Sequence, residues 1–413
     1  MNIAIIGSGP AGCYLAEHLL RLVPDASIDI LEKLPVPFGL IRYGVAPDHQ
    51  STKNVARVFD RVLSRDRVSF FGNVEVGRDV KLDELLGFYD AVVLATGAAR
   101  DRQLGIPGED LPGVTGSGAF VGWYNGHPHS QLPAVNEIRS AVVIGNGNVA
   151  LDVARVLAKG HNELSGSDLP NEVLGWLRAQ PLATIHIVGR RSAAEAKFND
   201  HELAEIGTLQ RARPIVNPSD ITGDGAVAKV LRGFAEAPER DTPVTIHFHF
   251  NLTPAEFVGN GALRAIKFRG VSNEVVELPA QLAVTCIGYE SFPCCSATPE
   301  NGRFTNDNGR IDDRLYVVGW AKRGPSGTIP TNRVEAQQVA QKIAQEIQSA
   351  NRPGNQGLRE LLKQRGCRAI DYEGWRRIDA VELSRAGKER CRDKLCSTNE
   401  MLDAAHAGQL RTA

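Results

Sequence analysis

The chain has 413 residues and a mass of 44.7 kDa, which is about two to three times a typical domain, so two domains are expected. Hydrophobic residues make up 42% and charged residues 23%, which excludes a disordered, collagen-like or coiled-coil chain. The 47 Lys and Arg residues nearly balance the 48 Asp and Glu residues. The chain therefore has no global excess of positive charge. Its composition gives no indication that it binds nucleic acid or an anionic membrane.

The apolar runs indicate where the protein is located, and the cysteine spacing indicates whether it binds a metal. No apolar run reaches about 18 residues, and Met1 leads into NIAIIG without a signal-peptide layout, so we expect a cytoplasmic protein without membrane attachment. The seven cysteines form no C-x-x-C pair and indicate reduced thiols. Cys294–Cys295 and Cys391–Cys396 fit no zinc spacing, and no metal site is predicted.

The chain begins with a predicted β–α–β unit. Residues 2–6 are a short apolar run typical of a buried strand, residues 10–22 have leucines at helical spacing, and residues 27–31 form the next strand. The turn between the first strand and the helix reads G-x-G-x-x-G. The first glycine allows a tight turn, the second allows the backbone to approach a pyrophosphate, and the third allows the helix to pack closely on the strand. We therefore predict a dinucleotide site at Gly7, Gly9 and Gly12.

Glu32 ends the second strand of this unit, where an acidic residue binds ribose hydroxyls. The Pro- and Gly-rich stretch 35–47 follows and predicts a shaped loop. Residues 50–64 are then predicted as a helix and residues 90–95 as another buried strand. A domain boundary is expected near residue 103.

The pattern restarts with a strand at 140–144 and a helix that ends near residue 158. The turn between them is Gly145-x-Gly147-x-x-Ala150, a second dinucleotide turn in which alanine takes the third position. The next strand, 184–188, is followed by Arg190 and Arg191 instead of an acid. Two guanidinium groups favour a 2′-phosphate, so the first site is predicted to bind FAD and the second NADP(H).

Later segments complete both units. Alternating residues within 216–280, as in 244–250 and 263–268, predict antiparallel strands. Residues 283–287 and 315–318 are expected as buried strands, residues 332–349 as a helix, and the tail 351–413 as packed on the body.

The chain resembles the adrenodoxin-reductase-like ferredoxin–NADP⁺ reductases over residues 1 to about 200 and about 283 to 402. The matching segments are IIGSGPAG (5–12), LEKLPVPFGLIRYGVAPDH (31–49), FFGNVEVGRDV (70–80), LATGA (94–98), FVGWYNGHP (120–128), IGNGNVALDVARVL (144–157), VGRRS (188–192) and VVGWAKRGPSGTIPTN (317–332). The resemblance implies an α/β fold of two Rossmann-like domains, with an NADP domain (104–285) inserted in an FAD domain (1–103 and 286–413).

The resemblance also assigns site residues. The implied FAD contacts, beyond the glycines and Glu32, are Ala11, Leu40, Val76, Trp320, Gly327, Thr328 and Ile329. The implied NADP contacts are Gly145, Asn146, Gly147, Asn148, Arg190, Arg191, Glu202 and, shared with the flavin, Gly327. His49 and Glu202 are the expected catalytic residues, with roles in orienting the nicotinamide and in proton balance. Asp152 is expected to bond His49 or to belong to a local network.

The implied activity transfers electrons from NADPH through FAD to a [2Fe–2S] or other ferredoxin-type acceptor, and a monomer is expected. The family has a basic residue where this chain has Ala204, and its basic docking segment is shortened between 205 and 240. We therefore expect the acceptor to dock on other basic residues, within 376–394. Two alternatives are the NADPH-oxidising flavin subunit of a larger reductase, such as glutamate synthase, and a flavin-binding module without turnover. The missing C-x-x-C pair argues against a disulfide reductase.

Overall fold

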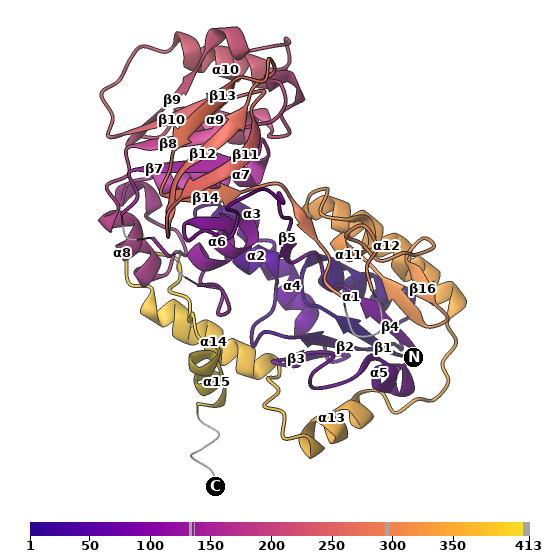
Figure 1. Ribbon diagram of the computed structural model, residues 1–413. Helices are drawn as coiled ribbons and strands as arrows, with labels where there is room; N and C mark the ends of the chain where they lie inside the picture. Colours follow the sequence, from indigo (N-terminus) through magenta and orange to yellow (C-terminus); the bar gives the residue numbers. More distant parts are fainter. Residues whose placement is uncertain (132–133, 136, 294–297, 408–413) are drawn as a thin grey trace. The chain divides into compact units, whose positions relative to one another are not determined.

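The structure is a computed structural model that describes residues 1–131, 134–135, 137–293 and 298–407, so Cys294 and Cys295 lie outside the described residues (Figure 1). The chain forms two compact units. Unit 1 comprises Met1–Arg100, Asn125–Pro128 and Tyr289–Ala413, and unit 2 comprises Asp101–Tyr124 and His129–Gly288. The two-residue strands β5 (Arg100–Asp101) and β15 (Tyr289–Glu290) lie where the chain passes from one unit to the other.

Unit 1 is built on a six-stranded sheet in the order β16-β17-β4-β1-β2-β3. All neighbouring strands are parallel except the edge pair β16–β17. The strand order reverses between β1 and β4, as in doubly wound folds that bind nucleotides at that point. The strands are β1 (Asn2–Ile6), β2 (Ser27–Glu32), β3 (Val68–Gly72), β4 (Ala91–Leu94), β16 (Arg310–Asp312) and β17 (Leu315–Val317).

Helices cover both faces of this sheet because alternate strand residues are apolar on both sides. Ile3 and Ile5 belong to one buried cluster, and Ala4 and Ile6 to the other. The first cluster includes residues of α1 (Pro10–Leu22), α4 (Ala56–Leu63), α12 (Ile329–Glu346), α14 (Tyr372–Arg385) and α15 (Thr398–His406). The second includes residues of α5 (Leu82–Phe88) and α13 (Asn355–Gln364). Short helices are α2 (Leu40–Tyr43), α3 (Gln50–Lys53) and α11 (Trp320–Arg323).

Unit 2 repeats this plan with a six-stranded sheet in the order β6-β14-β7-β8-β10-β9. Every neighbouring pair is parallel. The strands are β6 (Val114–Gly116), β7 (Ser140–Ile144), β8 (Thr184–Val188), β9 (Ala212–Val216), β10 (Val244–His249) and β14 (Leu282–Thr285).

The two faces of the second sheet have different covers. On one face, helices pack against the six-stranded sheet and form one buried cluster with it. On the other face, a three-stranded antiparallel sheet forms a second buried cluster with it. The helices are α6 (Ser117–Tyr124), α7 (Asn148–Ala158), α8 (Asn171–Ala179), α9 (Asp200–Gly207) and α10 (Ala226–Glu236). The small sheet contains β11 (Thr253–Gly259), β12 (Leu263–Arg269) and β13 (Val275–Pro279).

Most strands of the two β–α–β units have the predicted positions, but two segments differ. The predicted helix 50–64 is divided into α3 and α4, with Asn54 and Val55 between them. The prediction that 244–250 is an antiparallel strand was wrong, because β10 pairs in parallel with both β8 and β9. Buried and partly exposed residues alternate along β10 because Val244, Ile246 and Phe248 are buried under helices. The side chains on the opposite face of this strand are only partly covered.

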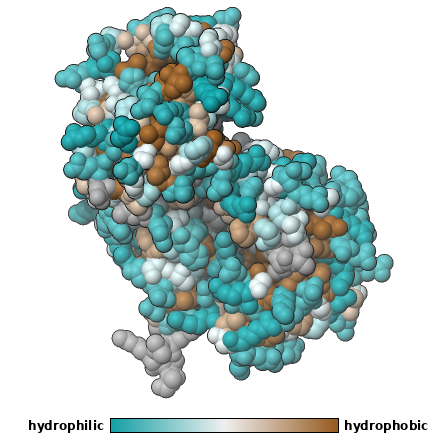
Figure 2. All heavy atoms as spheres, viewed as in Figure 1, coloured by the Kyte–Doolittle hydropathy of each residue, from teal (hydrophilic) through white to brown (hydrophobic). Residues whose placement is uncertain are grey.

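No helix in the described part of the chain has both the length and the apolar composition needed to span a bilayer. The face drawn in Figure 2 is largely hydrophilic, with hydrophobic residues scattered among polar ones. Isolated apolar residues on a surface are ordinary and mark no particular site.

Three histidines meet on the partly covered face of the second sheet. His186 of β8 and His249 of β10 have ring nitrogens 3.0 Å apart, and the ring of His247 lies 5.3 Å from that of His186. Burial, with the neighbouring histidines, lowers the pKa of His186 to about 3 and that of His249 to about 4. Burial also lowers the pKa of His247, and Arg213 adds to this effect. The folded protein therefore holds these imidazoles neutral.

We predict that unit 2 loses stability in mild acid because of this cluster. The unfolded chain takes up protons near the ordinary histidine pKa of about 6.5. Stability from the neutral histidines is therefore complete above that pH and is lost as pH falls toward 4. The free energy of opening of β8 and β10, measured from hydrogen-exchange protection factors, should fall between pH 7 and pH 5 by about 2 kcal/mol for each histidine that the fold keeps neutral. His186→Gln should reduce this fall; an equal fall in that variant would contradict the assignment.

Candidate functional site

The first glycine-rich turn lies where the strand order of unit 1 reverses. Gly7 has φ +112°, and a Cβ atom there would lie 2.4 Å from the carbonyl oxygen of Ala95, just after β4. A Cβ atom on Gly12 would lie 2.1 Å from the carbonyl oxygen of Gly7. Both positions therefore exclude any side chain. Gly9 differs, because a Cβ atom there would meet no atom within 4 Å. The backbone at Gly9 is thus open to a ligand at the start of α1.

Glu32 organises this turn from the end of β2. Its Oε2 accepts hydrogen bonds from the backbone nitrogen of Ser8 (3.1 Å) and from the Ser8 hydroxyl (2.7 Å), and its Oε1 accepts one from the backbone nitrogen of Leu34 (3.1 Å). The carboxylate is buried. The predicted ribose-binding acid therefore also fixes the backbone of the turn, a contact that sequence spacing does not show.

The proline-rich loop packs against the same turn. The backbone nitrogen of Phe38 donates to the carbonyl oxygen of Ser8 (3.2 Å), and a Cβ atom on Gly39 would lie 3.2 Å from the Cα atom of Gly9. Phe38 and Gly39 both have positive φ, of 82° and 48°. Leu40 begins α2 directly afterwards and is 44% exposed. Val76 lies elsewhere, at the edge of the second buried cluster of unit 1.

The segment after β17 approaches the turn from another side. Gly319 has φ +75°, and a Cβ atom there would lie 2.6 Å from the Ala11 Cβ. Its backbone nitrogen donates to Glu335 Oε2 (2.8 Å), and that carboxylate also pairs with Arg323. Trp320 follows and stacks on Tyr289, with ring centroids 6.0 Å apart.

The predicted residues Gly327, Thr328 and Ile329 lead into α12. Gly327 has φ +81°, and Thr328 is the N-cap of the helix, with its backbone nitrogen donating to the Thr331 hydroxyl (3.1 Å). Contacts thus place Gly39 beside Gly9 and Gly319 beside Ala11 in unit 1. Val76 instead packs on the second buried cluster, and residues 327–329 lead into α12. His49 is the residue before α3, and its carbonyl oxygen accepts from the backbone nitrogens of Thr52 and Lys53.

The second glycine-rich turn has the same geometry within unit 2. Gly145 has φ +145°, and a Cβ atom there would lie 2.3 Å from the carbonyl oxygen of Cys286, just after β14. Gly147 has no neighbour within 4 Å of such an atom, and Ala150 in the third position is fully buried. The side-chain oxygen and nitrogen of Asn146 are buried and have no hydrogen-bond partner among the described residues. Polar atoms of this kind are costly unless a ligand or water satisfies them.

The predicted arginine pair stands beside this turn. The Asn146 side chain lies over Gly189, since a Cβ atom on Gly189 would be 1.7 Å from Asn146 Nδ2. Arg190 and Arg191 come next and are exposed, and Arg191 is 3.9 Å from Glu195. The guanidinium groups are therefore accessible at the end of β8, next to the turn.

Helix α9 is anchored to the second glycine-rich turn by two side-chain links. Asn148 Oδ1 accepts from the backbone nitrogen of Asn199 (2.9 Å), and Asn199 Oδ1 in turn caps α9 by accepting from the backbone nitrogen of Glu202 (2.7 Å). Buried Arg155 pairs with Asp152 and lies 3.6 Å from Glu205. Asp152 thus belongs to a local network, one of its two expected roles.

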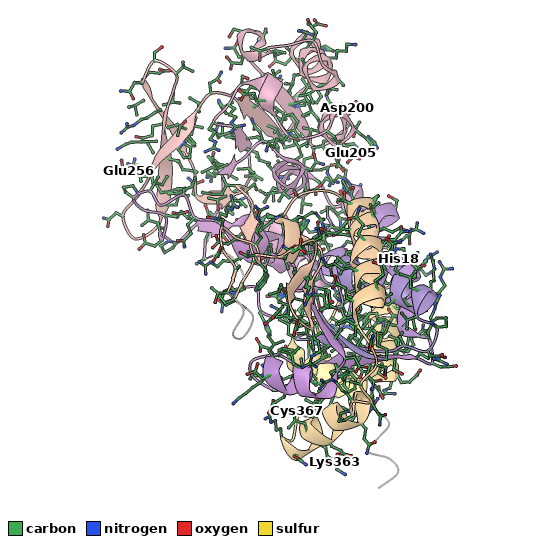
Figure 3. All side chains as sticks on the ribbon, turned by 90° about the vertical axis from the view of Figure 1, so that its right-hand side faces the viewer. His18, Asp200, Glu205, Glu256, Lys363 and Cys367 are labelled. Atoms are coloured by element: carbon green, nitrogen blue, oxygen red, sulfur yellow. The ribbon has the colours of Figure 1, made fainter. Side chains whose placement is uncertain are left out.

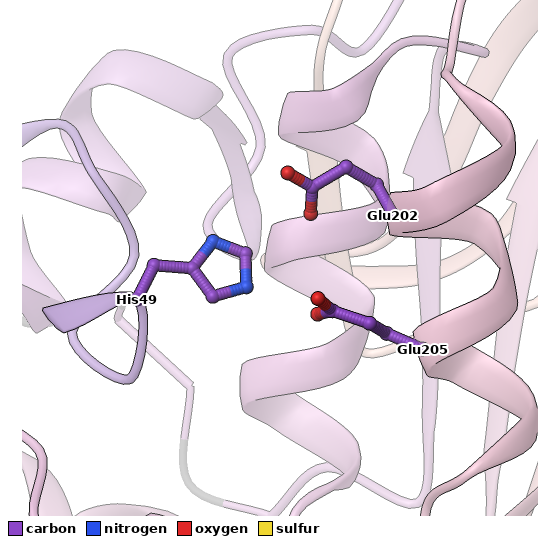
Figure 4. Close-up of side chains that lie close together, drawn as sticks. All are labelled: His49, Glu202 and Glu205. Carbon is purple, nitrogen blue, oxygen red and sulfur yellow. The ribbon is translucent and has the colours of Figure 1, made fainter. Parts of the chain in front are cut away.

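The catalytic candidate Glu202 and its neighbour Glu205 extend from the same side of α9 (Figure 4). The exposed Asp200 begins this helix, which also carries Glu205 (both are labelled in Figure 3). Sequence reasoning did not select Glu205, although its position one turn after Glu202 was a usable signal.

A buried ionic network in unit 1 was also missed. Arg42, beside the predicted flavin contact Leu40, pairs with Glu382 of α14, and both are almost completely buried. Arg392 joins Glu382 to Asp379, at 2.8 and 2.6 Å. The Arg42 guanidinium, with Arg392, holds the pKa of Glu382 below its usual value despite burial. No local spacing indicates a pair that is more than 300 residues apart in the sequence.

Known proteins with this architecture identify the family. Residues 1–206 match the family described as pyridine nucleotide-disulphide oxidoreductase. The chain is 39% identical to cindoxin reductase of Citrobacter braakii, covering 98% of this chain and 91% of the relative. It is 39% identical to the mitochondrial NADPH:adrenodoxin oxidoreductase of Homo sapiens, covering 97% and 91%. The chain belongs to the adrenodoxin-reductase-like ferredoxin–NADP⁺ reductase family. The structure of Mycobacterium tuberculosis FprA in complex with NADPH superposes with a TM-score of 0.91, at 36% identity, covering 98% and 99% of the two chains.

Membership in the reductase family makes the chain an oxidoreductase that uses FAD and NADP(H). The residues fit both cofactors, because each glycine-rich turn leaves an open approach to the backbone and the unpartnered Asn146 lies at the second. The five cysteines that the structure describes do not fit a redox-active disulfide. The described cysteines are free, and burial raises the pKa values of Cys13 and Cys286 well above the ordinary range. Buried thiols of high pKa are poor nucleophiles.

We predict that Gly9→Ala and Gly147→Ala separate the two cofactors. An alanine methyl group meets no protein atom at either position, and φ is −72° at Gly9 and −124° at Gly147, so folding should be unaffected. Each methyl group would instead crowd a bound pyrophosphate, at about 1–3 kcal/mol, or roughly 10–10²-fold in affinity. Gly9→Ala should weaken FAD alone and Gly147→Ala NADPH alone, as measured by calorimetry. Loss of both ligands in either variant would refute separate sites.

We further predict that Arg190 and Arg191 set the preference for NADPH. Hydrogen bonds to charged groups contribute about 1.5–3 kcal/mol each, less when exposed. The double variant Arg190→Ala/Arg191→Ala should therefore lower kcat/KM for NADPH by about 10²-fold while changing that for NADH little. Steady-state kinetics with ferricyanide as acceptor measures both. An equal loss with NADH would show that the arginines are structural.

Proposed function

We propose that this chain oxidises NADPH and passes the electrons through FAD to a [2Fe–2S] protein of the ferredoxin type. The observation that supports it best is the pair of open glycine-rich turns, one followed by Glu32 and the other by Arg190 and Arg191. Relatives named for adrenodoxin, cindoxin and ferredoxin reduction align over almost the whole chain. We further propose that the protein acts as a monomer.

Unit 1 is proposed to bind FAD and unit 2 to bind NADP(H). Gly7, Gly9, Ala11 and Gly12 at the start of α1 support the first assignment, because a free helix N-terminus and an open backbone attract a pyrophosphate. The equivalent backbone of Gly145–Asn148 supports the second. When bound, FAD supplies the redox chemistry, taking two electrons from NADPH and releasing them one at a time.

His49 and Glu202 are proposed to position the nicotinamide and to hold or move a proton. His49 stands at the end of the shaped loop, where backbone bonds to α3 fix it. Glu202 is fixed by the Asn199 cap, which Asn148 of the second turn holds in place. Both side chains are thus tied through backbone contacts to the segments that the cofactors are proposed to occupy, as positioning requires.

Two other functions fit less well. A flavin subunit of a larger reductase and a flavin-binding module without turnover could both keep the two turns. The chain covers 91% of the adrenodoxin and cindoxin reductases and 98% of a mycobacterial NADPH-ferredoxin reductase. The accessible Arg190 and Arg191 favour the use of NADPH over a module without turnover. Mixing the protein with NADPH tests the proposal: rapid flavin bleaching supports it, and its absence would favour the module.

We predict that His49→Ala and Glu202→Ala each slow flavin reduction by NADPH about 10–10³-fold, the range for lost positioning or proton transfer. The FAD content should stay normal, because neither side chain is assigned to FAD. Stopped-flow absorbance measures the rate. Asp200→Ala, an exposed change on the same helix as Glu202, is the control and should reduce at the wild-type rate. Wild-type rates in both test variants would remove these residues from the mechanism.

A further inference from the structure

The arginines expected to dock the acceptor are held by other parts of unit 1. Arg376 pairs with Asp60 at 3.3 Å, Arg390 with Asp393 at 3.1 Å, and Arg392 with Asp379 and Glu382. The Arg377 guanidinium donates to the carbonyl oxygen of Ala405. The basic segment 376–394 therefore mainly fastens the C-terminal helices, and most of its charge is already neutralised.

A different set of cations is available on α4. Arg57 and Arg61 are four residues apart, and Arg65 follows four residues later, just past the end of the helix; all three are exposed. Residues at this spacing lie on one side of a helix. None of the three forms an ion pair with any described residue, whereas nearby Arg67 pairs with Asp25 at 3.2 Å. Arg57, Arg61 and Arg65 form the α4 stripe, in which like charges at this spacing oppose helix formation. The Arg61 Nε donates to the carbonyl oxygen of Arg57 (3.3 Å), but no carboxylate among the described residues pairs with the three guanidinium groups.

The opposite side of α4 leads to the proposed flavin loop. Phe59 is fully buried and forms an edge-to-face contact with Tyr14 of α1, with ring centroids 4.9 Å apart. It also lies 6.4 Å from the ring of Phe38, which precedes Gly39 and Leu40. One helix thickness, about 10 Å, therefore separates the exposed arginines from the loop that meets the first glycine-rich turn. A protein bound to the stripe would lie close to the proposed flavin site.

We infer that Arg57, Arg61 and Arg65 form a docking surface for an acidic face of the iron–sulfur acceptor. The inference rests on the proposed function, which supplies the class of partner. An acidic surface complements three cations in a row, and such charges act chiefly by steering encounter and fixing orientation. The surface belongs to unit 1 alone and replaces the segment 376–394 as the expected contact.

The test compares charge reversal on α4 with charge reversal elsewhere. The triple variant Arg57→Glu/Arg61→Glu/Arg65→Glu is assayed with NADPH and a plant-type [2Fe–2S] ferredoxin. KM for ferredoxin should rise about 10–10²-fold with little change in kcat, and the salt dependence of kcat/KM should flatten. Ferricyanide reduction should stay within about twofold of wild type, because a small acceptor needs no docking surface.

The control Arg264→Glu/Arg269→Glu/Lys363→Glu changes net charge equally at exposed positions on β12 and α13 (Lys363 is labelled in Figure 3). Equal ferredoxin kinetics in the two triple variants would overturn the docking surface. If the glutamate triple loses FAD or ferricyanide activity, Arg57→Gln/Arg61→Gln/Arg65→Gln decides: a raised KM for ferredoxin supports the surface and an unchanged one overturns it. A wild-type protein that reduces ferricyanide but no ferredoxin would overturn the proposed function, and the docking surface with it.

Discussion

Each glycine-rich turn lies against the backbone that follows the strand on the other side of the point where the strand order reverses. Gly7 lies against the carbonyl oxygen of Ala95 in unit 1, and Gly145 lies against that of Cys286 in unit 2. A side chain at either position would overlap backbone that cannot move without breaking the parallel sheet. This contact sets the direction in which α1 and α7 begin. It thereby leaves Gly9 and Gly147 open to a phosphate.

Other contacts extend from the first turn. Glu32 holds Ser8, the backbone of Phe38 binds the same residue, and Gly319 packs on Ala11. Residues 32–38 and the distant segment at Gly319 are therefore both fixed to one short turn. The buried Arg42–Glu382 pair adds the C-terminal helices, so the last part of the chain helps to hold the proposed flavin loop. A buried pair of this kind adds little net stability, but removing one partner leaves an expensive unpaired charge.

The charges of unit 1 divide into two groups with different uses. Arginines of α14 and the segment after it are engaged by carboxylates and carbonyl oxygens of the same unit. The arginines of the α4 stripe remain available to another molecule. Sequence composition does not distinguish the two groups, because a basic run looks the same whether its partners are internal or external. Only the position of Asp60, Asp393 and Ala405 in space makes the difference.

The sequence by itself determined the two β–α–β units, their glycine-rich turns and the families of cofactor. These features depend on local requirements: positive φ, absence of a Cβ atom, apolar runs of strand length, and an acid or arginines at a strand end. Tertiary structure alone decided that β10 is parallel, that Glu32 binds Ser8, that Arg42 is neutralised by Glu382, and that α9 is capped through Asn148. The physical reason is that strand direction and ion pairing depend on neighbours in space, which a short stretch of sequence does not specify.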